Sequence, residues 1–71
     1  MDALATRDEF TRLRRRLIEL HRALGAHRAR LKATPEGARQ ALGLVAEGRR
    51  LHAELRTVRR RFATLRRPLS A

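Results

Sequence analysis

The sequence contains no cysteine, tryptophan or tyrosine, and its only aromatic residues are Phe10 and Phe62. Without cysteine the chain forms neither a disulfide nor a thiolate metal site, and this composition is compatible with a reducing cytoplasm. Both phenylalanines belong to the apolar pattern described below. We therefore expect no exposed aromatic ring that could stack on a nucleobase.

Long apolar segments are also missing. The longest run without a charged residue covers residues 40–46, far short of the roughly 20 apolar residues that a membrane-spanning helix requires. The first residues, Met1 to Leu4, lack the basic and then apolar layout of a secretory signal. We expect a single soluble domain over residues 1–71, with a cytoplasmic location and no membrane span.

Groups suited to catalysis are scarce. The sequence offers no nucleophile paired with a base, no acids paired for proton transfer and no glycine-rich phosphate loop. His27 falls on the apolar pattern, which favours a core histidine. His21 and His52, with Glu19 or Glu54 nearby, would supply zinc ligands, but their spacing is not that of a metal site. We expect no enzymatic activity, no cofactor and no bound metal.

Apolar side chains recur in steps of three and four between residues 10 and 31. The series is Phe10, Leu13, Leu17, Leu20, Leu24, His27 and Leu31. Such heptad spacing places one narrow apolar seam along a helix, and this seam must pack against another helix. Because Thr6 and Glu9 have the layout of a capping box, the first helix is expected over about residues 6–33, or from near Asp2 if the apolar residues that follow it join the helix.

A break is predicted at residues 34–37, because Pro35 disfavours helical geometry before it and lacks an amide donor. The second helix is expected over about residues 36–67. Pro68 is expected to end it and to begin a short C-terminal tail, residues 68–71. The second seam again alternates steps of three and four, through Ala41, Leu44, Gly48, Leu51, Leu55, Val58, Phe62, Leu65 and Leu69.

A connection this short makes the two helices antiparallel. The predicted fold class is therefore all-α, an antiparallel two-helix hairpin that resembles a coiled coil. If the turn is tight, Leu17 lies near Leu51 and Phe10 lies near Val58. A one-step slip along the turn would change each of these pairs.

The apolar stripe widens beyond the seam in the half of the hairpin next to the turn. Leu42, Val45 and Ala46 broaden it on the second helix, and Ile18 lies outside the seam of the first. Two helices that share one seam bury little apolar surface for their length. We expect these four side chains to dock on a second copy, giving a four-helix bundle, or on another protein.

Positive charge dominates the composition: 18 Lys and Arg residues stand against 7 Asp and Glu residues, a formal net charge of +11. All of these cations except Lys32 are arginines, which suit bidentate contact with phosphate, although a GC-rich genome also favours arginine. An antiparallel hairpin brings residues 7–22 and 49–67, which are rich in arginine, to one end. We call this end the basic pole, and its candidate binding residues are Arg12, Arg15, Arg16, Arg56, Arg59, Arg60, Arg61 and Arg67.

Crowded like charges repel one another, and sequences that accept this cost commonly bind a polyanion. The simpler alternative is a solvated basic face that only keeps the protein soluble. Among polyanions, nucleic acid is favoured because its phosphates bind arginine without regard to base sequence. The sequence thus predicts binding to RNA or DNA, which it does not distinguish, without base-specific readout. The alternative function is a small adaptor or accessory subunit that docks its helices on a partner protein.

Overall fold

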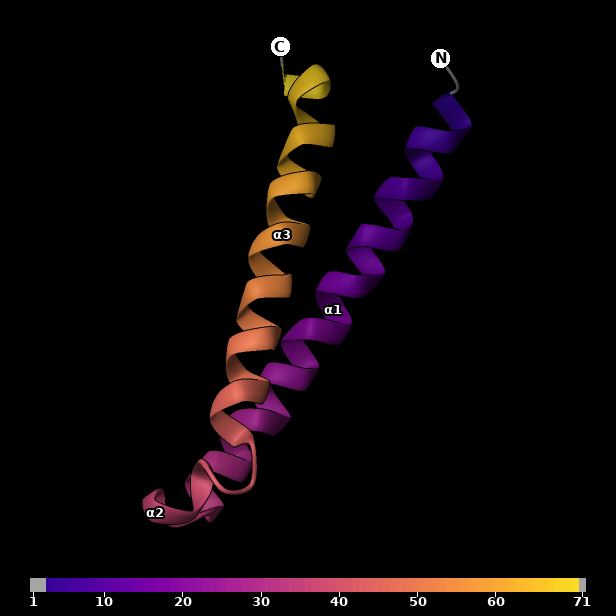
Figure 1. Ribbon diagram of the computed structural model, residues 1–71. Helices are drawn as coiled ribbons and strands as arrows, with labels where there is room; N and C mark the ends of the chain where they lie inside the picture. Colours follow the sequence, from indigo (N-terminus) through magenta and orange to yellow (C-terminus); the bar gives the residue numbers. More distant parts are fainter. Residues whose placement is uncertain (1–2, 71) are drawn as a thin grey trace.

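The computed structural model describes residues 3–70, and every regular element within them is an α-helix. Helix α1 spans Ala3–Ala33, helix α2 spans Glu36–Arg39 and helix α3 spans Leu44–Ser70. The two long helices run side by side in opposite directions, so that both chain ends lie at the same end of a rod measuring 51 × 17 × 15 Å (Figure 1). The predicted all-α class is confirmed, and the arrangement is hairpin-like.

Helix α1 begins at Ala3, three residues before Thr6, which agrees with the alternative prediction of a start near Asp2. The apolar residues ahead of Thr6 are good helix formers, and they extend the helix toward the N-terminus. The predicted capping box is wrong, because Thr6 lies inside the helix and the Glu9 carboxylate accepts hydrogen bonds from Arg61 of α3. A side chain engaged between the helices does not reach back to cap its own helix.

The last carbonyl groups of α1 are capped by side chains near the break. The Thr34 hydroxyl donates to the Arg30 carbonyl at 2.7 Å. Arg39 Nε, from α2, donates to the carbonyls of Leu31 at 3.1 Å and Thr34 at 3.2 Å. The short helix therefore folds back on the end of α1 and satisfies carbonyls that have no partner within that helix. Pro35, at φ −56° and ψ 142°, precedes this short helix.

The predicted continuous helix over residues 36–67 is interrupted by a turn at residues 40–43. Gly43 has φ +71°, a left-handed conformation that favours glycine. Its amide donates to the Gln40 carbonyl, and its own carbonyl accepts the first hydrogen bond of α3, from the Glu47 amide at 3.0 Å. The left-handed Gly43 thus completes the turn that separates α2 from α3. The prediction was wrong because it treated Gly43 as a residue of the helix interior.

Helix α3 continues through Pro68 to Ser70, so the predicted helix end at Pro68 is also wrong. Proline lacks the N–H that would bond the carbonyl of Thr64. In the final turn this removes one backbone hydrogen bond, and the helix continues for two residues more. The predicted tail is therefore helical over residues 68–70, and its last residue lies outside the described part of the chain.

The predicted seams form the core between the two long helices. Leu20 is fully buried, and the other buried apolar side chains pack around it or lie at the start of α3. These are Leu24, Leu44, Leu55 and Val58, with Leu13, Leu17 and Leu51 partly buried against the cluster. The Phe10 and Phe62 rings stack with their centroids 4.5 Å apart. The register is one helical turn beyond the predicted contact of Phe10 with Val58, because α2 and the turn after it lengthen the connection.

Candidate nucleic-acid interface

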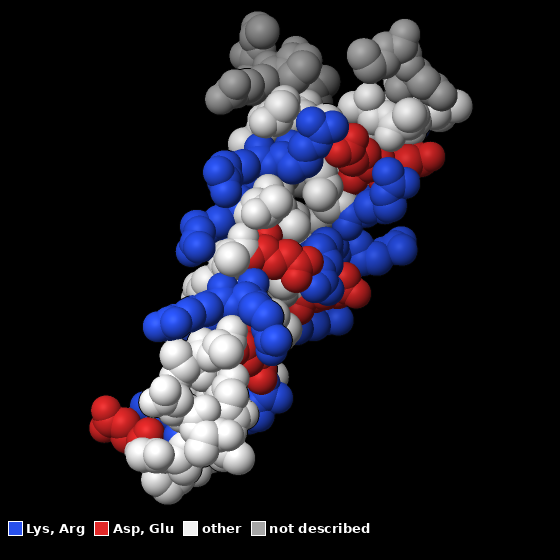
Figure 2. All heavy atoms as spheres, viewed as in Figure 1, with Lys and Arg blue, Asp and Glu red and all other residues white. Residues whose placement is uncertain are grey.

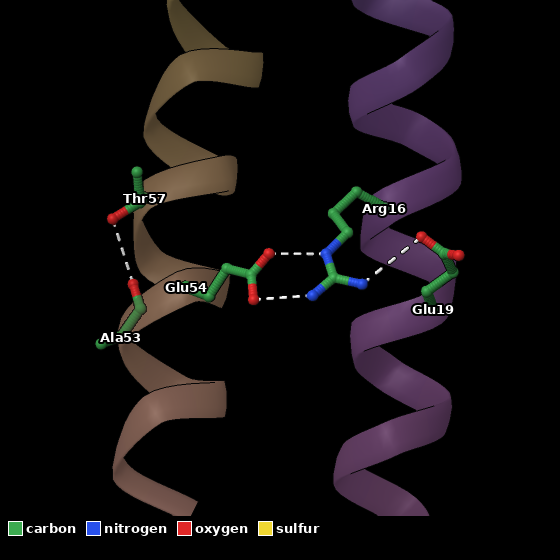
Figure 3. A network of polar contacts seen from close by, with 5 residues as sticks. All are labelled: Arg16, Glu19, Ala53, Glu54 and Thr57. Carbon is green, nitrogen blue, oxygen red and sulfur yellow. Dashed lines mark hydrogen bonds and ion pairs between the residues drawn. The ribbon is translucent and has the colours of Figure 1, made fainter. Parts of the chain in front are cut away.

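Ion pairs join α1 to α3 along one side of the seam. Arg16 donates to both carboxylate oxygens of Glu54, from Nε at 2.5 Å and from Nη2 at 2.7 Å (Figure 3). Its Nη1 lies 3.5 Å from Glu19 Oε1 on the same helix. These contacts hold the pKa of the Glu54 carboxyl below its usual value, against a smaller effect of desolvation. Arg16 is therefore engaged by two carboxylates.

Two further pairs repeat this arrangement toward each end of the rod. Arg61 donates from Nε to Glu9 Oε1 at 2.5 Å and from Nη2 to Oε2 at 3.0 Å, which lowers the pKa of Glu9. Arg30 forms an ion pair with Glu47 near the turn. The three pairs connect the two long helices and neutralise three of the acids that the structure describes.

All three pairs occupy equivalent heptad positions. Each paired residue immediately precedes a seam residue, as Arg16 precedes Leu17 and Glu54 precedes Leu55. We call this side of the seam the ion-pair flank. The opposite side, which we call the acid-free flank, holds the residues that immediately follow the other set of seam positions, which are Leu13, Leu20 and His27 on α1 and Leu44, Leu51, Val58 and Leu65 on α3. Its members are Arg14, His21 and Arg28 on α1, and Val45, His52, Arg59 and Arg66 on α3.

The structure divides the predicted basic pole. Arg16 and Arg61 lie on the ion-pair flank and are engaged by carboxylates. Arg12 is exposed and contributes to the lowered pKa of Glu9. The remaining candidates with described side chains are exposed, and their guanidinium groups form no ion pair or hydrogen bond within the described part of the chain. They are Arg15, Arg56, Arg59 and Arg60. The side chain of Arg67, a further candidate, lies outside the described residues.

Arg14 and Arg49 were not among the predicted binding residues. Both are exposed, and neither forms an ion pair with any residue that the structure describes. The heptad position of Arg14 could have indicated it from the sequence, because Arg14 follows the seam residue Leu13 and so lies on the side of the seam opposite the Arg16–Glu54 pair. Residues of both helices gather on the acid-free flank without any acid among them.

The two ends of the rod differ in surface charge. Figure 2 shows basic side chains along most of the α1–α3 pair, with acidic side chains between them, and a largely uncharged surface at the end that holds the turn. Of the four side chains predicted to form an oligomer or partner interface, Leu42, Val45 and Ala46 lie close together in sequence at this end. The exposed fractions are 66% for Leu42 and 43% for Val45, and Ala46 is exposed as well.

Ile18, the fourth predicted interface residue, is 47% exposed but lies apart from the other three. The Arg16–Glu54 pair places it beside the middle of α3. Glu54 is nine residues, about 14 Å of helical rise, from Val45. The predicted apolar interface is therefore one patch near the turn plus a separate isoleucine.

Two of the three histidines have structural contacts. His27 is buried, with an exposed fraction of 6%, and its Nε2–H donates to the Leu44 carbonyl at 2.7 Å. His52 donates from Nδ1 to the Gly48 carbonyl at 2.8 Å. Within residues 3–70 no group of three or more His, Cys, Asp or Glu side chains is placed to hold a metal ion. No helix in the same range is both long and apolar enough to cross a bilayer.

Comparison with known proteins yields no match: no family model fits the chain, and no curated protein or solved structure matches it.

Proposed function

We propose that this chain is a non-enzymatic nucleic-acid-binding protein that contacts phosphates through the basic pole without base-specific readout. The observation that carries this proposal is the separation of paired from unpaired charge. The acids of the pole that join the helices, Glu9 and Glu54, are each engaged by an arginine, whereas Arg15, Arg56, Arg59 and Arg60 remain exposed. Exposed guanidinium groups on a rigid rod favour an anionic polymer as ligand.

The aromatic residues support recognition of phosphate rather than of bases. Phe10 and Phe62 are the only aromatic residues of the sequence, and they stack on each other inside the helix pair. The guanidinium carbon of Arg66 lies over the Phe62 ring, 5.9 Å from its centre. Neither ring is therefore available to a nucleobase, and affinity must come from charge.

Salt-dependent binding tests the proposal. Fluorescence anisotropy with labelled random-sequence DNA and RNA oligomers, from low to moderate salt, gives the slope of log affinity against log salt. Each neutralised phosphate contributes about −0.9 to this slope on duplex DNA. We expect a slope steeper than about −2, and the double variant Arg59→Glu/Arg60→Glu should weaken binding. Affinity no better than that of an unstructured basic peptide, unchanged in this variant, would refute the proposal.

The exposed apolar patch near the turn favours a second candidate function, a protein-interaction module. We propose that Leu42, Val45 and Ala46 pack against a second copy, so that two antiparallel hairpins form a four-helix bundle. An adaptor that docks this patch on another helical protein is the alternative. Size-exclusion chromatography with light scattering should give twice the monomer mass, and Leu42→Gln/Val45→Gln should give a folded monomer. A monomeric wild type that gains helix only with a partner would favour the adaptor.

A further inference from the structure

We propose that the acid-free flank is the surface that contacts nucleic acid, and that its ligand is the sugar–phosphate backbone of a double-stranded helix. This inference rests on the proposed function. The binding surface is then one flank of the basic pole, and the ligand is a duplex rather than a single strand. Arginines on this flank should matter for binding, whereas arginines elsewhere on the same helices should not.

Of the two flanks of the seam, only one contains acidic residues. All three interhelical ion pairs lie on the ion-pair flank. The acid-free flank and the helical positions beside it, which include Lys32, Arg49 and Arg56, contain no aspartate or glutamate. The arginines on this side of the seam therefore have no carboxylate of the flank between them. An anionic ligand placed here supplies the negative charge that the protein itself supplies on the ion-pair flank.

The length of the flank matches the spacing of phosphates along a duplex. On α1 the flank extends from Arg14 to Arg28, about 21 Å of helical rise, and on α3 the arginines on the flank and beside it extend from Arg49 to Arg66, about 26 Å. Successive phosphates of one strand are about 3.4 Å apart along a duplex axis, so the row on α1 spans about six of them and the row on α3 about eight. The two rows lie on helices whose axes are about 8–10 Å apart, which falls between the widths of the minor and major grooves, about 6 and 12 Å. Each row can then contact the backbone on one side of a groove.

The protein lacks exposed aromatic rings of the kind that single-strand-binding proteins use to stack bases. Proteins that bind single strands combine basic grooves with aromatic rings on which successive bases stack. Here Phe10 and Phe62 stack on each other, and the sequence has no other aromatic residue. A duplex keeps its own bases stacked and presents only phosphates, which is what a flank of arginines recognises.

The test compares two double variants of the full chain that remove equal charge from the same pole. Arg56→Gln/Arg59→Gln neutralises one arginine of the acid-free flank and one beside it, whereas Arg22→Gln/Arg50→Gln neutralises two exposed arginines that lie away from this flank and are not among the candidate binding residues. Binding is measured by anisotropy as a function of salt, with 20-base-pair DNA and RNA duplexes and with the matching single strands as probes. Circular dichroism at 222 nm verifies that each variant folds.

We expect the wild type to bind duplex at least fivefold more tightly than single strand. The flank variant should lose tenfold or more and reduce the magnitude of the salt slope by about 2, because two phosphate contacts are lost. The control variant should lose threefold or less, with an unchanged slope. Arg14→Gln/Arg49→Gln, a second pair of substitutions on and beside the flank, should repeat the result if the first variant proves less helical. The DNA and RNA probes together decide which duplex is preferred.

Equal losses in the flank and control variants would overturn the inference but leave the proposed function intact, because binding would then follow net charge. Tighter binding to the single strands would reject the duplex as ligand. A wild type without salt-dependent binding to any probe would overturn the inference and the proposed function together.

Discussion

The buried His27 side chain packs against Gly48. We therefore predict that Gly48→Ala lowers stability, whereas the same substitution at Gly25 raises it. A Cβ atom added to Gly48 would lie 2.7 Å from His27 Cε1 and 3.0 Å from Nε2. The imidazole has little freedom to move away, because it is buried between the helices and donates a hydrogen bond to the Leu44 carbonyl. Gly25, in the middle of α1, has no atom within 4 Å of the same added Cβ.

Alanine replaces glycine with a gain of about 1 kcal/mol in helix propensity at either position. At Gly25 nothing opposes this gain, so Gly25→Ala should stabilise the protein by about 0.5–1 kcal/mol. At Gly48 the gain is opposed by overpacking, which costs about 1–3 kcal/mol, and by a weakened hydrogen bond worth about 1 kcal/mol. Gly48→Ala should therefore destabilise the protein by about 1–2 kcal/mol.

Urea unfolding followed by circular dichroism at 222 nm, at a fixed protein concentration, measures both changes. The midpoint should rise for Gly25→Ala and fall for Gly48→Ala, with equal slopes. The double variant His27→Ala/Gly48→Ala tests the assigned cause, because removal of the imidazole relieves the clash and the two substitutions should couple favourably. A Gly48→Ala variant as stable as Gly25→Ala would refute the packing of the imidazole on this glycine.

Three further outcomes follow from the turn and from the charges. Gly43→Ala should destabilise the protein by about 1–2 kcal/mol in the same urea assay, because alanine is strained at φ +71°. Arg61→Glu should lower the urea midpoint by breaking the pair with Glu9, whereas Arg59→Glu should raise it by relieving repulsion on the acid-free flank; equal shifts would contradict the division into two flanks. The lowered pKa values of Glu9 and Glu54 stabilise the folded state above about pH 4.3. This stabilisation should be lost as pH falls through the lowered values, and Glu9→Gln/Glu54→Gln should flatten the pH dependence of the urea midpoint.

The seams were predictable because side chains at heptad spacing lie on one face of a helix. Leu13, Leu17 and Leu20 recur on one face, and the structure packs that face against α3. Even the interruption at His27 was interpreted correctly as a core histidine. The helix start at Ala3 was less predictable, since a capping box and an ion-pairing glutamate look alike in sequence.

The turn at residues 40–43 was not predicted, because the sequence alone does not show the backbone conformation of a glycine within a long apolar pattern. Gly25 and Gly48 lie within helices, whereas Gly43 takes a positive φ and immediately precedes α3. That difference depends on how α2 folds back, with Arg39 donating to the carbonyls at the end of α1. Contacts of this kind arise only after the helices have met, and they shift the register by one turn.

The division of the basic pole follows from charge order along the seam. Glu9 and Arg16 on α1 alternate in sign, and Glu54 and Arg61 on α3 alternate at the same interval of seven residues. In the observed register each acid meets an arginine. A slip of seven residues on one helix places Arg16 against Arg61, and a slip in the other direction places Glu9 against Glu54. Either slip sets like charges together, which selects the observed register. The arginines of the acid-free flank contribute nothing to this selection. In the proposed function, the phosphates of a bound nucleic acid offset the repulsion among these arginines.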